Sequence, residues 1–246
     1  MGEPPVTVEA PAKVTLSLRI IGVRDDGYHL IDAEMVTVDL CDQLKIADGD
    51  GLEIVSQDER EVPAGNENLV TKALDLVGRR AHVRLEKRIP AGAGLGGGSS
   101  DAAALLRWAG HRDLDQAASI GADVPFCVVG GRARVHGIGE LVEPLPFVEG
   151  ELTLLTPPFG CSTSAVYRMW DQMGGPHADG GGGNDLEAAA LRVEPRLATY
   201  RDRLAGATGE RPRLAGSGST WFVEGGFPGE DRLVVRRLPE SEKLRR

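Results

Sequence analysis

The chain has 246 residues, of which 41% are hydrophobic and 33 are glycine, and its formal net charge is −9. This length suffices for one large domain or two smaller ones, each with a hydrophobic core. The acidic balance argues against nucleic acid or a membrane surface as a partner, and no apolar run approaches the ~18 residues of a membrane span.

The cysteines and the first residues indicate the compartment. Cys41, Cys127 and Cys161 are far apart, odd in number and not part of a CxxC pair, which argues against a disulfide framework or a zinc site. Residues 1–13 have no apolar signal core. We therefore expect a soluble, reduced protein of the cytoplasm, a monomer or weak homodimer, with no side chains dedicated to a metal ion.

The first half of the chain predicts strands, turns and short helices. Alternating polar and apolar residues predict strands at 13–21 and 31–40, separated by the turn DDGYH at 25–29. Further strands are expected at 43–46, 52–55 and 81–87, and helices at 68–77, 100–109 and 114–121. Asn68 is a candidate N-cap. Asp123, in GADVPF, is expected between a helix end and an apolar strand.

The second half continues the mixture without regular alternation. A buried strand is predicted at 151–158 and a helix at 162–170, capped by Ser162 or Thr163. The remaining expectations are a flexible loop at 174–184, helices at 185–191 and 195–204, a strand, glycine turn and strand at 213–224, and a closing strand with a frayed end after 230. This order predicts an α+β fold with two lobes that meet near residue 150, divided into residues 1–148 and 149–246.

The stretch IPAGAGLGGGSSDAA at 89–103 is the most informative segment. Glycine is destabilising in ordinary structure by roughly 0.5–1 kcal/mol relative to alanine, so a glycine-rich loop directly before a helix needs a reason. Bare amides at a helix N-terminus can all point at one anion. We therefore favour a cradle for nucleotide phosphates, in which Ser99 and Ser100 supply hydroxyls.

Other interpretations of this loop remain open at this point. Gly92, Gly94 and Gly97 satisfy GxGxxG, but a dinucleotide-binding unit needs a second parallel strand after its helix, and residues 113–120 look helical. A Walker-type loop is excluded because no lysine follows the glycines. A mobile linker is less favoured because the loop lies between a clear strand and an alanine-rich helix.

Four other features are ambiguous when each is taken alone. Lys13 is at the head of a strand, where most lysines are ordinary surface cations. Asp123 precedes Val124 and Pro125 at a corner that aspartate commonly caps. Tyr28 and His29 could stack a base or simply pack, and AGSGST at 215–220 could be a plain hairpin turn.

Together and in order, these segments resemble the GHMP kinases. The resemblance rests on APAKVTLSLRIIGVRDDGYH at 10–29, IPAGAGLGGGSSDAAA at 89–104, GADVPFCVVGGRARVHGIGE at 121–140, NDLE at 184–187 and RLAGSGST at 213–220. Within this family, the segments GLGGGSS and GADVPF together resemble the motifs of the branch that phosphorylates CDP-methylerythritol. The resemblance implies a two-lobed α+β fold, an N-terminal ATP-binding domain and an active site in the cleft between the lobes.

The resemblance also implies roles for individual residues. Asp123 would be the catalytic base for the C2 hydroxyl of the methylerythritol unit, and Lys13 its charge partner. ATP would be held by the glycine loop, namely Pro90, Gly92, Gly94, Leu95, Gly96, Gly97, Gly98, Ser99 and Ser100. The small-molecule substrate would be held by Thr15, Tyr28, His29, Thr163, Tyr167, Gly216 and Ser217. Mg²⁺ would arrive on the nucleotide.

Two departures from the pattern keep alternatives open. Thr15 stands where this branch usually has an asparagine that contacts substrate, and residues 108–123 form a shorter stretch than expected. Another GHMP-type kinase, for homoserine or mevalonate, is one alternative, and a nucleotide-binding homologue without catalysis is another. Tyr28, His29 and Tyr167 favour the cytidine substrate because a base-stacking pair has little purpose without a base.

Overall fold

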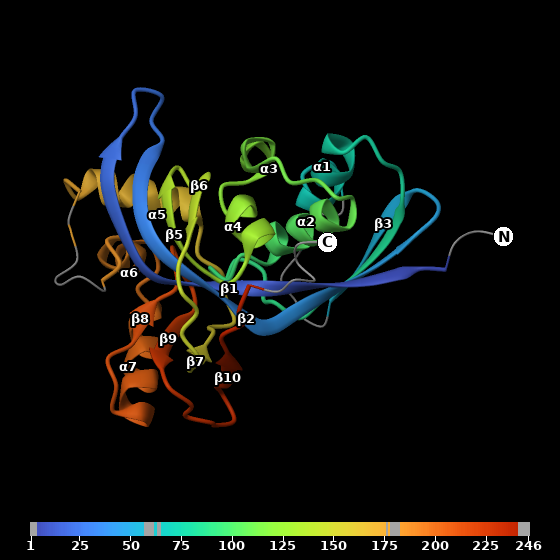
Figure 1. The fold of residues 1–246 in the computed structure, drawn as a ribbon. Helices are drawn as coiled ribbons and strands as arrows, with labels where there is room; N and C mark the ends of the chain where they lie inside the picture. Colours follow the sequence, from blue (N-terminus) through green and yellow to red (C-terminus); the bar gives the residue numbers. More distant parts are fainter. Residues whose placement is uncertain (1–3, 57–61, 63–64, 176, 178–182, 241–246) are drawn as a thin grey trace.

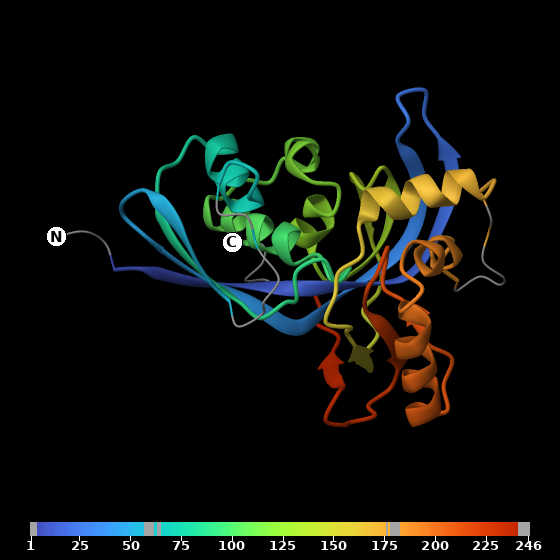
Figure 2. The same ribbon diagram turned by 180° about the vertical axis from the view of Figure 1, so that it is seen from behind.

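The structure, a computed structural model, describes residues 4–56, 62, 65–175, 177 and 183–240. In this part of the chain the strands form two sheets, one of six strands and one of four. Helices α1–α4, which lie between Leu69 and Val129, gather on one side of a long two-stranded ribbon, and the second sheet and helix α7 (Leu197–Thr208) lie on the other side (Figures 1 and 2). The α+β fold class predicted from the sequence is confirmed, because helices and the strands of two sheets are mixed along the chain.

The first sheet is built on two unusually long strands. Its strands are β1 (Val6–Val23), β2 (His29–Ala47), β3 (Gly51–Ser56), β4 (His82–Lys87), β5 (Arg132–Gly137) and β6 (Leu141–Pro144). β2 pairs antiparallel with β1 along nearly its whole length, with β5 at its first half and with β4 at its second. The alternation of buried and exposed residues in β4 and β5 is that of strands with one face on a core.

Four helices cover one face of this sheet. They are α1 (Leu69–Leu76), α2 (Gly97–Trp108), α3 (Leu114–Ile120) and α4 (Val124–Val129). The Asn68 side chain accepts the amide of Val70 at 2.8 Å and so caps α1, as the sequence predicts. α2 is buried along most of its length because its small and aliphatic residues pack closely against β1, α1 and α4.

The second sheet and its helices come from the last hundred residues. The order is β7 (Glu151–Leu155), α5 (Thr163–Gln172), α6 (Glu187–Val193), α7 (Leu197–Thr208), β8 (Arg213–Leu214), β9 (Trp221–Glu224) and β10 (Leu233–Arg236). The strand order β10-β7-β9-β8 places the closing strand at one edge. Part of the predicted loop 174–184 and of the predicted frayed end lies outside the described residues.

Several sequence expectations were wrong in detail. The apolar run after Asp123 forms helix α4 and not a strand. Strands predicted at 31–40 and 43–46 are one continuous strand, and β5 and β6 were not predicted. α2 begins three residues before the expected start, because the glycines at 97 and 98 are already helical.

The passage from β6 to β7 is also the place where the chain leaves one sheet for the other. The division into residues 1–148 and 149–246 falls in this passage and stays a prediction. No helix in the described ranges combines the length and the apolar character that a membrane crossing requires.

Candidate functional site

A cavity of about 720 Å³, lined by residues of β1, the glycine loop, α2 and α5, brings the predicted residues together. Its wall includes all the residues proposed above from sequence except Ser100. The Ser100 hydroxyl instead donates to the carbonyl of Pro11 at 2.8 Å and is buried. Because successive helical residues point about 100° apart, Ser99 faces the cavity while Ser100 faces the sheet.

The glycine loop is glycine-rich because other segments of the same chain press against it. Gly94 and Gly96 both have left-handed backbones, with φ of +78° and +70°. A side chain at Gly94 would collide with the carbonyl oxygens of Ala215 and Gly218, the second at 2.9 Å. One at Gly96 would lie 2.8 Å from Cγ of Lys13. The loop therefore fits only without side chains at these positions.

The loop ends by presenting the N-terminus of α2 to the cavity. Gly96 is the N-cap residue, and it has no side chain with which to cap the helix. The amides of the first helical residues, Gly97, Gly98 and Ser99, have no partner within the helix, and all three residues line the cavity. Together with the partial positive charge of the helix end, these N–H groups form a site suited to an anion.

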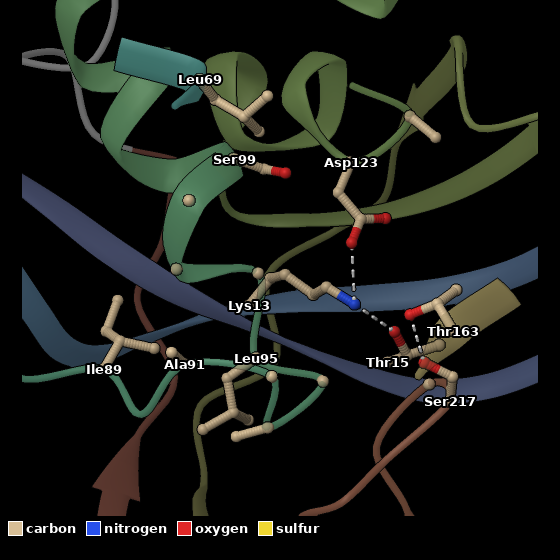
Figure 3. A pocket seen from close by; sticks show the side chains of 18 of the residues that line it. Lys13, Thr15, Leu69, Ile89, Ala91, Leu95, Ser99, Asp123, Thr163 and Ser217 are labelled. Carbon is tan, nitrogen blue, oxygen red and sulfur yellow. Dashed lines mark hydrogen bonds and ion pairs between the residues drawn. The ribbon is translucent and has the colours of Figure 1, made fainter. Parts of the chain in front are cut away.

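Lys13 and Asp123 meet across this cavity. The Lys13 ammonium lies 3.2 Å from a carboxylate oxygen of Asp123 and donates to the hydroxyl of Thr15 at 3.1 Å (Figure 3). Lys13 and Thr15 are two residues apart on β1 and so share a face, whereas Asp123 is the N-cap residue of α4. The Lys13 side chain is 5% exposed and that of Asp123 is 34% exposed, so the carboxylate is open to a ligand.

The opposite wall is formed by the second half of the chain. The hydroxyls of Thr163, at the start of α5, and Ser217 are 2.9 Å apart (Figure 3). Asn184 donates to the carbonyls of Leu214 and Gly216 and thereby holds the glycine turn against the start of α6. The turn predicted at 215–220 therefore forms part of the cavity wall, and the hydrogen bonds of Asn184 hold it in place.

At one end of the cavity an aromatic group connects the β1–β2 hairpin to α5. The ring of His29 lies 4.8 Å from that of Tyr167 and 5.6 Å from that of Trp170, and its Nε2 is 2.8 Å from a carboxylate oxygen of Asp171. Tyr28 is 59% exposed and also lines the cavity. Burial raises the pKa of the Tyr167 phenol, so its ring is neutral.

A buried ionic cluster at the base of the cavity was not predicted from the sequence. Lys87 contacts the carboxylates of both Asp42 and Asp101, the latter at 2.7 Å. Lys87 and Asp101 line the cavity, and a side chain at Gly97 would lie 3.1 Å from the Lys87 ammonium. The one local signal was Asp101, which follows GGGSS directly; nothing near Asp42 or Lys87 indicates that they meet.

Comparison with known proteins gives a consistent result. The family described as "GHMP kinases N terminal domain" matches residues 68–131. The 4-diphosphocytidyl-2-C-methyl-D-erythritol kinase of Paramagnetospirillum magneticum is 36% identical over 251 residues, which cover 88% of this chain and 87% of that protein. The enzyme of the same name from Paracoccus denitrificans is 37% identical over 231 residues, 87% of this chain and 84% of that protein.

Solved structures show the same fold. A crystal structure of 4-(cytidine 5'-diphospho)-2C-methyl-D-erythritol kinase matches with a TM-score of 0.75 and 30% identity, covering 94% of this chain and 99% of that one. A homoserine kinase from Cytophaga hutchinsonii matches with a TM-score of 0.57 and 20% identity, covering 93% of this chain and 87% of that one. The second likeness shows the fold alone.

Proposed function

This chain belongs to the 4-diphosphocytidyl-2-C-methyl-D-erythritol kinase family of the GHMP kinases, and we propose on that basis that it transfers the γ-phosphate of ATP to the C2 hydroxyl of 4-diphosphocytidyl-2-C-methyl-D-erythritol. The observation that carries the proposal is the Lys13–Asp123 pair, which lies in the same cavity as the glycine loop and the N-terminus of α2. Phosphoryl transfer to an alcohol requires that the phosphate site and the base lie in one cavity, so that both can act on the same phosphoryl group.

ATP would bind with its phosphates along the glycine loop. The amides of Gly97, Gly98 and Ser99 would donate to phosphate oxygens, and the helix N-terminus would offset their negative charge. Backbone donors suit this task because their positions are fixed before the ligand arrives. Mg²⁺ would be held by phosphate oxygens and water and would neutralise charge on the nucleotide.

Asp123 and Lys13 would act on the acceptor alcohol. As the C2 oxygen forms its bond to the γ-phosphorus, the bond between that phosphorus and the bridging oxygen breaks, and ADP leaves with the electron pair. The Asp123 carboxylate would take the proton of the C2 hydroxyl. The Lys13 ammonium would stabilise the charge on the transferred phosphoryl group, which is spread over its equatorial oxygens.

The aromatic end of the cavity would hold the cytidine. Tyr28 and Tyr167 come from opposite walls and could enclose a base between their rings, with His29 at its edge. Thr163, Gly216 and Ser217 would contact the rest of this substrate. All these residues belong to one chain, so we propose that a monomer is competent. Cys41, Cys127 and Cys161 are free thiols, which suits the reducing cytoplasm.

Replacement of Asp123 by asparagine tests the base. We expect kcat to fall by about 10²–10⁴-fold because the amide cannot accept the proton, while ADP affinity by calorimetry changes little. ADP release in a coupled assay with the cytidine substrate measures kcat. Normal turnover by D123N would refute the assignment of the base.

A substrate panel tests the acceptor. We expect wild-type protein to release ADP with 4-diphosphocytidyl-2-C-methyl-D-erythritol and not with homoserine or mevalonate. Phosphorylation of one of the latter two alone would assign the chain another acceptor. ATP binding without turnover on any acceptor would mean that the chain binds nucleotide without catalysis.

A further inference from the structure

The Lys13 ammonium has more contacts than its ion pair with Asp123 alone would give it. Its side chain is nearly buried, and it donates to both the Thr15 hydroxyl oxygen and the Asp123 carboxylate (Figure 3). Thr15 itself is 2% exposed. An ammonium group has three N–H donors, so these two contacts leave one donor for a ligand in the cavity.

The stem of Lys13 is fixed from two further sides. A side chain at Gly96 would lie 2.8 Å from Cγ and 3.1 Å from Cε of Lys13, which shows how closely the glycine loop covers the stem. The Gly216 backbone covers the other end, since a side chain there would lie 3.6 Å from the ammonium and 3.7 Å from the Thr15 oxygen. The last freedom of the group, rotation about its terminal bond, is restricted by its two acceptors.

Thr15 is well suited to be one of these acceptors. As a β-branched residue in a strand it has few side-chain rotamers, so its oxygen has a fixed position. That oxygen accepts a hydrogen bond from the Lys13 ammonium, and the bond is between buried atoms. A hydrogen bond to a charged group is worth about 1.5–3 kcal/mol, which is enough to select one orientation of the ammonium.

We propose that Thr15 is a positioning residue for phosphoryl transfer: its hydroxyl oxygen and Asp123 together orient the Lys13 ammonium so that the remaining N–H meets the transferred phosphoryl group. This inference rests on the proposed kinase function. It differs from the role that the sequence implies for Thr15, which is a direct contact with the cytidine substrate. A contact made through Lys13 affects the transition state, whereas a direct contact affects substrate binding.

Three variants of the full chain separate these roles. T15V keeps the shape of the side chain and removes the acceptor, T15S keeps the acceptor and removes the methyl group, and T15A removes both. Thr37, a buried threonine of β2 outside the cavity wall, provides a matched control as T37V. The measurements are kcat and KM for both substrates, ADP affinity, and Tm to establish folding.

We expect T15V and T15A to lower kcat about tenfold or more, with both KM values within about twofold of wild type. T15S and T37V should stay within about threefold of wild-type kcat. Wild-type kcat in T15V would overturn the proposal, and so would a raised KM for the cytidine substrate at unchanged kcat, which would restore the direct contact. T15S as impaired as T15V would assign the effect to packing of the methyl group.

The proposed function can fail separately. If wild-type protein phosphorylates a different alcohol, the same variants are measured with that alcohol, and the expectations for Thr15 are unchanged. If wild-type protein phosphorylates no acceptor, both the function and the role of Thr15 are refuted. If the enzyme is active on the cytidine substrate and only T15V and T15A lose kcat, both the proposed function and the role of Thr15 are supported.

Discussion

Asp101 is the most perturbed carboxyl group near the candidate site. It is buried at the base of the cavity, and its Oδ1 has no hydrogen-bond partner among the described residues. Burial raises its pKa to about 7, although the Lys87 ammonium opposes the shift. Asp42, the other carboxylate of the cluster, also accepts the amide of Ile89 at 2.8 Å. The cluster therefore has one ammonium for two carboxyl groups, and a proton on Asp101 balances it.

This shift makes the free energy of unfolding depend on pH. The ordinary pKa of the group is 3.8, so between about pH 4 and pH 7 the folded chain holds a proton that the unfolded chain has lost. The contribution of Asp101 to stability is therefore greatest at low pH and decreases as the pH rises to about 7. We expect wild type to lose stability between pH 5.5 and pH 7.5 relative to D101N, by on the order of 2 kcal/mol. Urea unfolding at both pH values measures this, and parallel changes in the two proteins would contradict it.

The individual residues of the site show where sequence reasoning succeeds. Lys13 and Asp123 could be predicted as partners because each stands in a recognisable segment, and the structure places them 3.2 Å apart. Ser100 could not be separated from Ser99, because which of them faces the cavity depends on the residue at which α2 starts. The contact of Lys87 with Asp42 and Asp101 depends on strand pairing between distant segments, for which the sequence has no local signal.

At the scale of the element, α4 shows why an apolar run is ambiguous. Residues 124–129 are apolar, and three of the six are valine, a composition that favours a strand. They form a helix that is buried on nearly every side, and a short fully apolar run has the same pattern in either structure. Conversely, the alternation of polar and apolar residues in β5 was a visible signal of a strand. Arg132 and Arg134 pair with Glu34 and Asp32 of β2 on its polar face.

The loop before α2 allows a matched test of backbone crowding. Gly94 and Gly110 have similar left-handed φ values, +78° and +75°, but only Gly94 has neighbours within reach of an added side chain. We expect G110A to lower the free energy of unfolding by about 1 kcal/mol, the conformational cost alone. G94A should lower it by about 3 kcal/mol because carbonyl oxygens must also move, and should raise KM for ATP. Equal losses in urea unfolding would show that the crowding is relieved without cost.

At the scale of the whole molecule, the NDLE segment joins the first sheet to the second half of the chain. Asp185 is buried and accepts the guanidinium of Arg19 at 2.8 Å and the amide of Ile20 at 2.9 Å. Its own amide donates to the carbonyl of Leu18. The edge of β1 is thus bonded to the segment that leads into α6. The sequence marked NDLE as characteristic, but only the fold shows that it acts as a connection.

Removal of the Asp185 carboxylate should destabilise the entire structure. We expect D185A to lower the free energy of unfolding by about 3–5 kcal/mol, because it leaves a buried amide and a partly buried guanidinium without this acceptor. D202A is the control: Asp202 also pairs with an arginine, Arg201, but its side chain is 68% exposed. We expect a change below about 1 kcal/mol there. Similar losses in both variants, measured by urea unfolding, would refute a special role for Asp185.

The supports of the glycine loop have a consequence for synthesis of the chain. The carbonyls of Gly92 and Ala93 accept the amides of Cys161 and Thr220, so the loop is braced by residues made long after it. A chain emerges from the ribosome with its N-terminus first. A nascent chain that ends near residue 150 would contain every strand of the first sheet and all of α1–α4, yet its nucleotide cradle would still lack one side. Competence to bind ligand is therefore acquired late in translation.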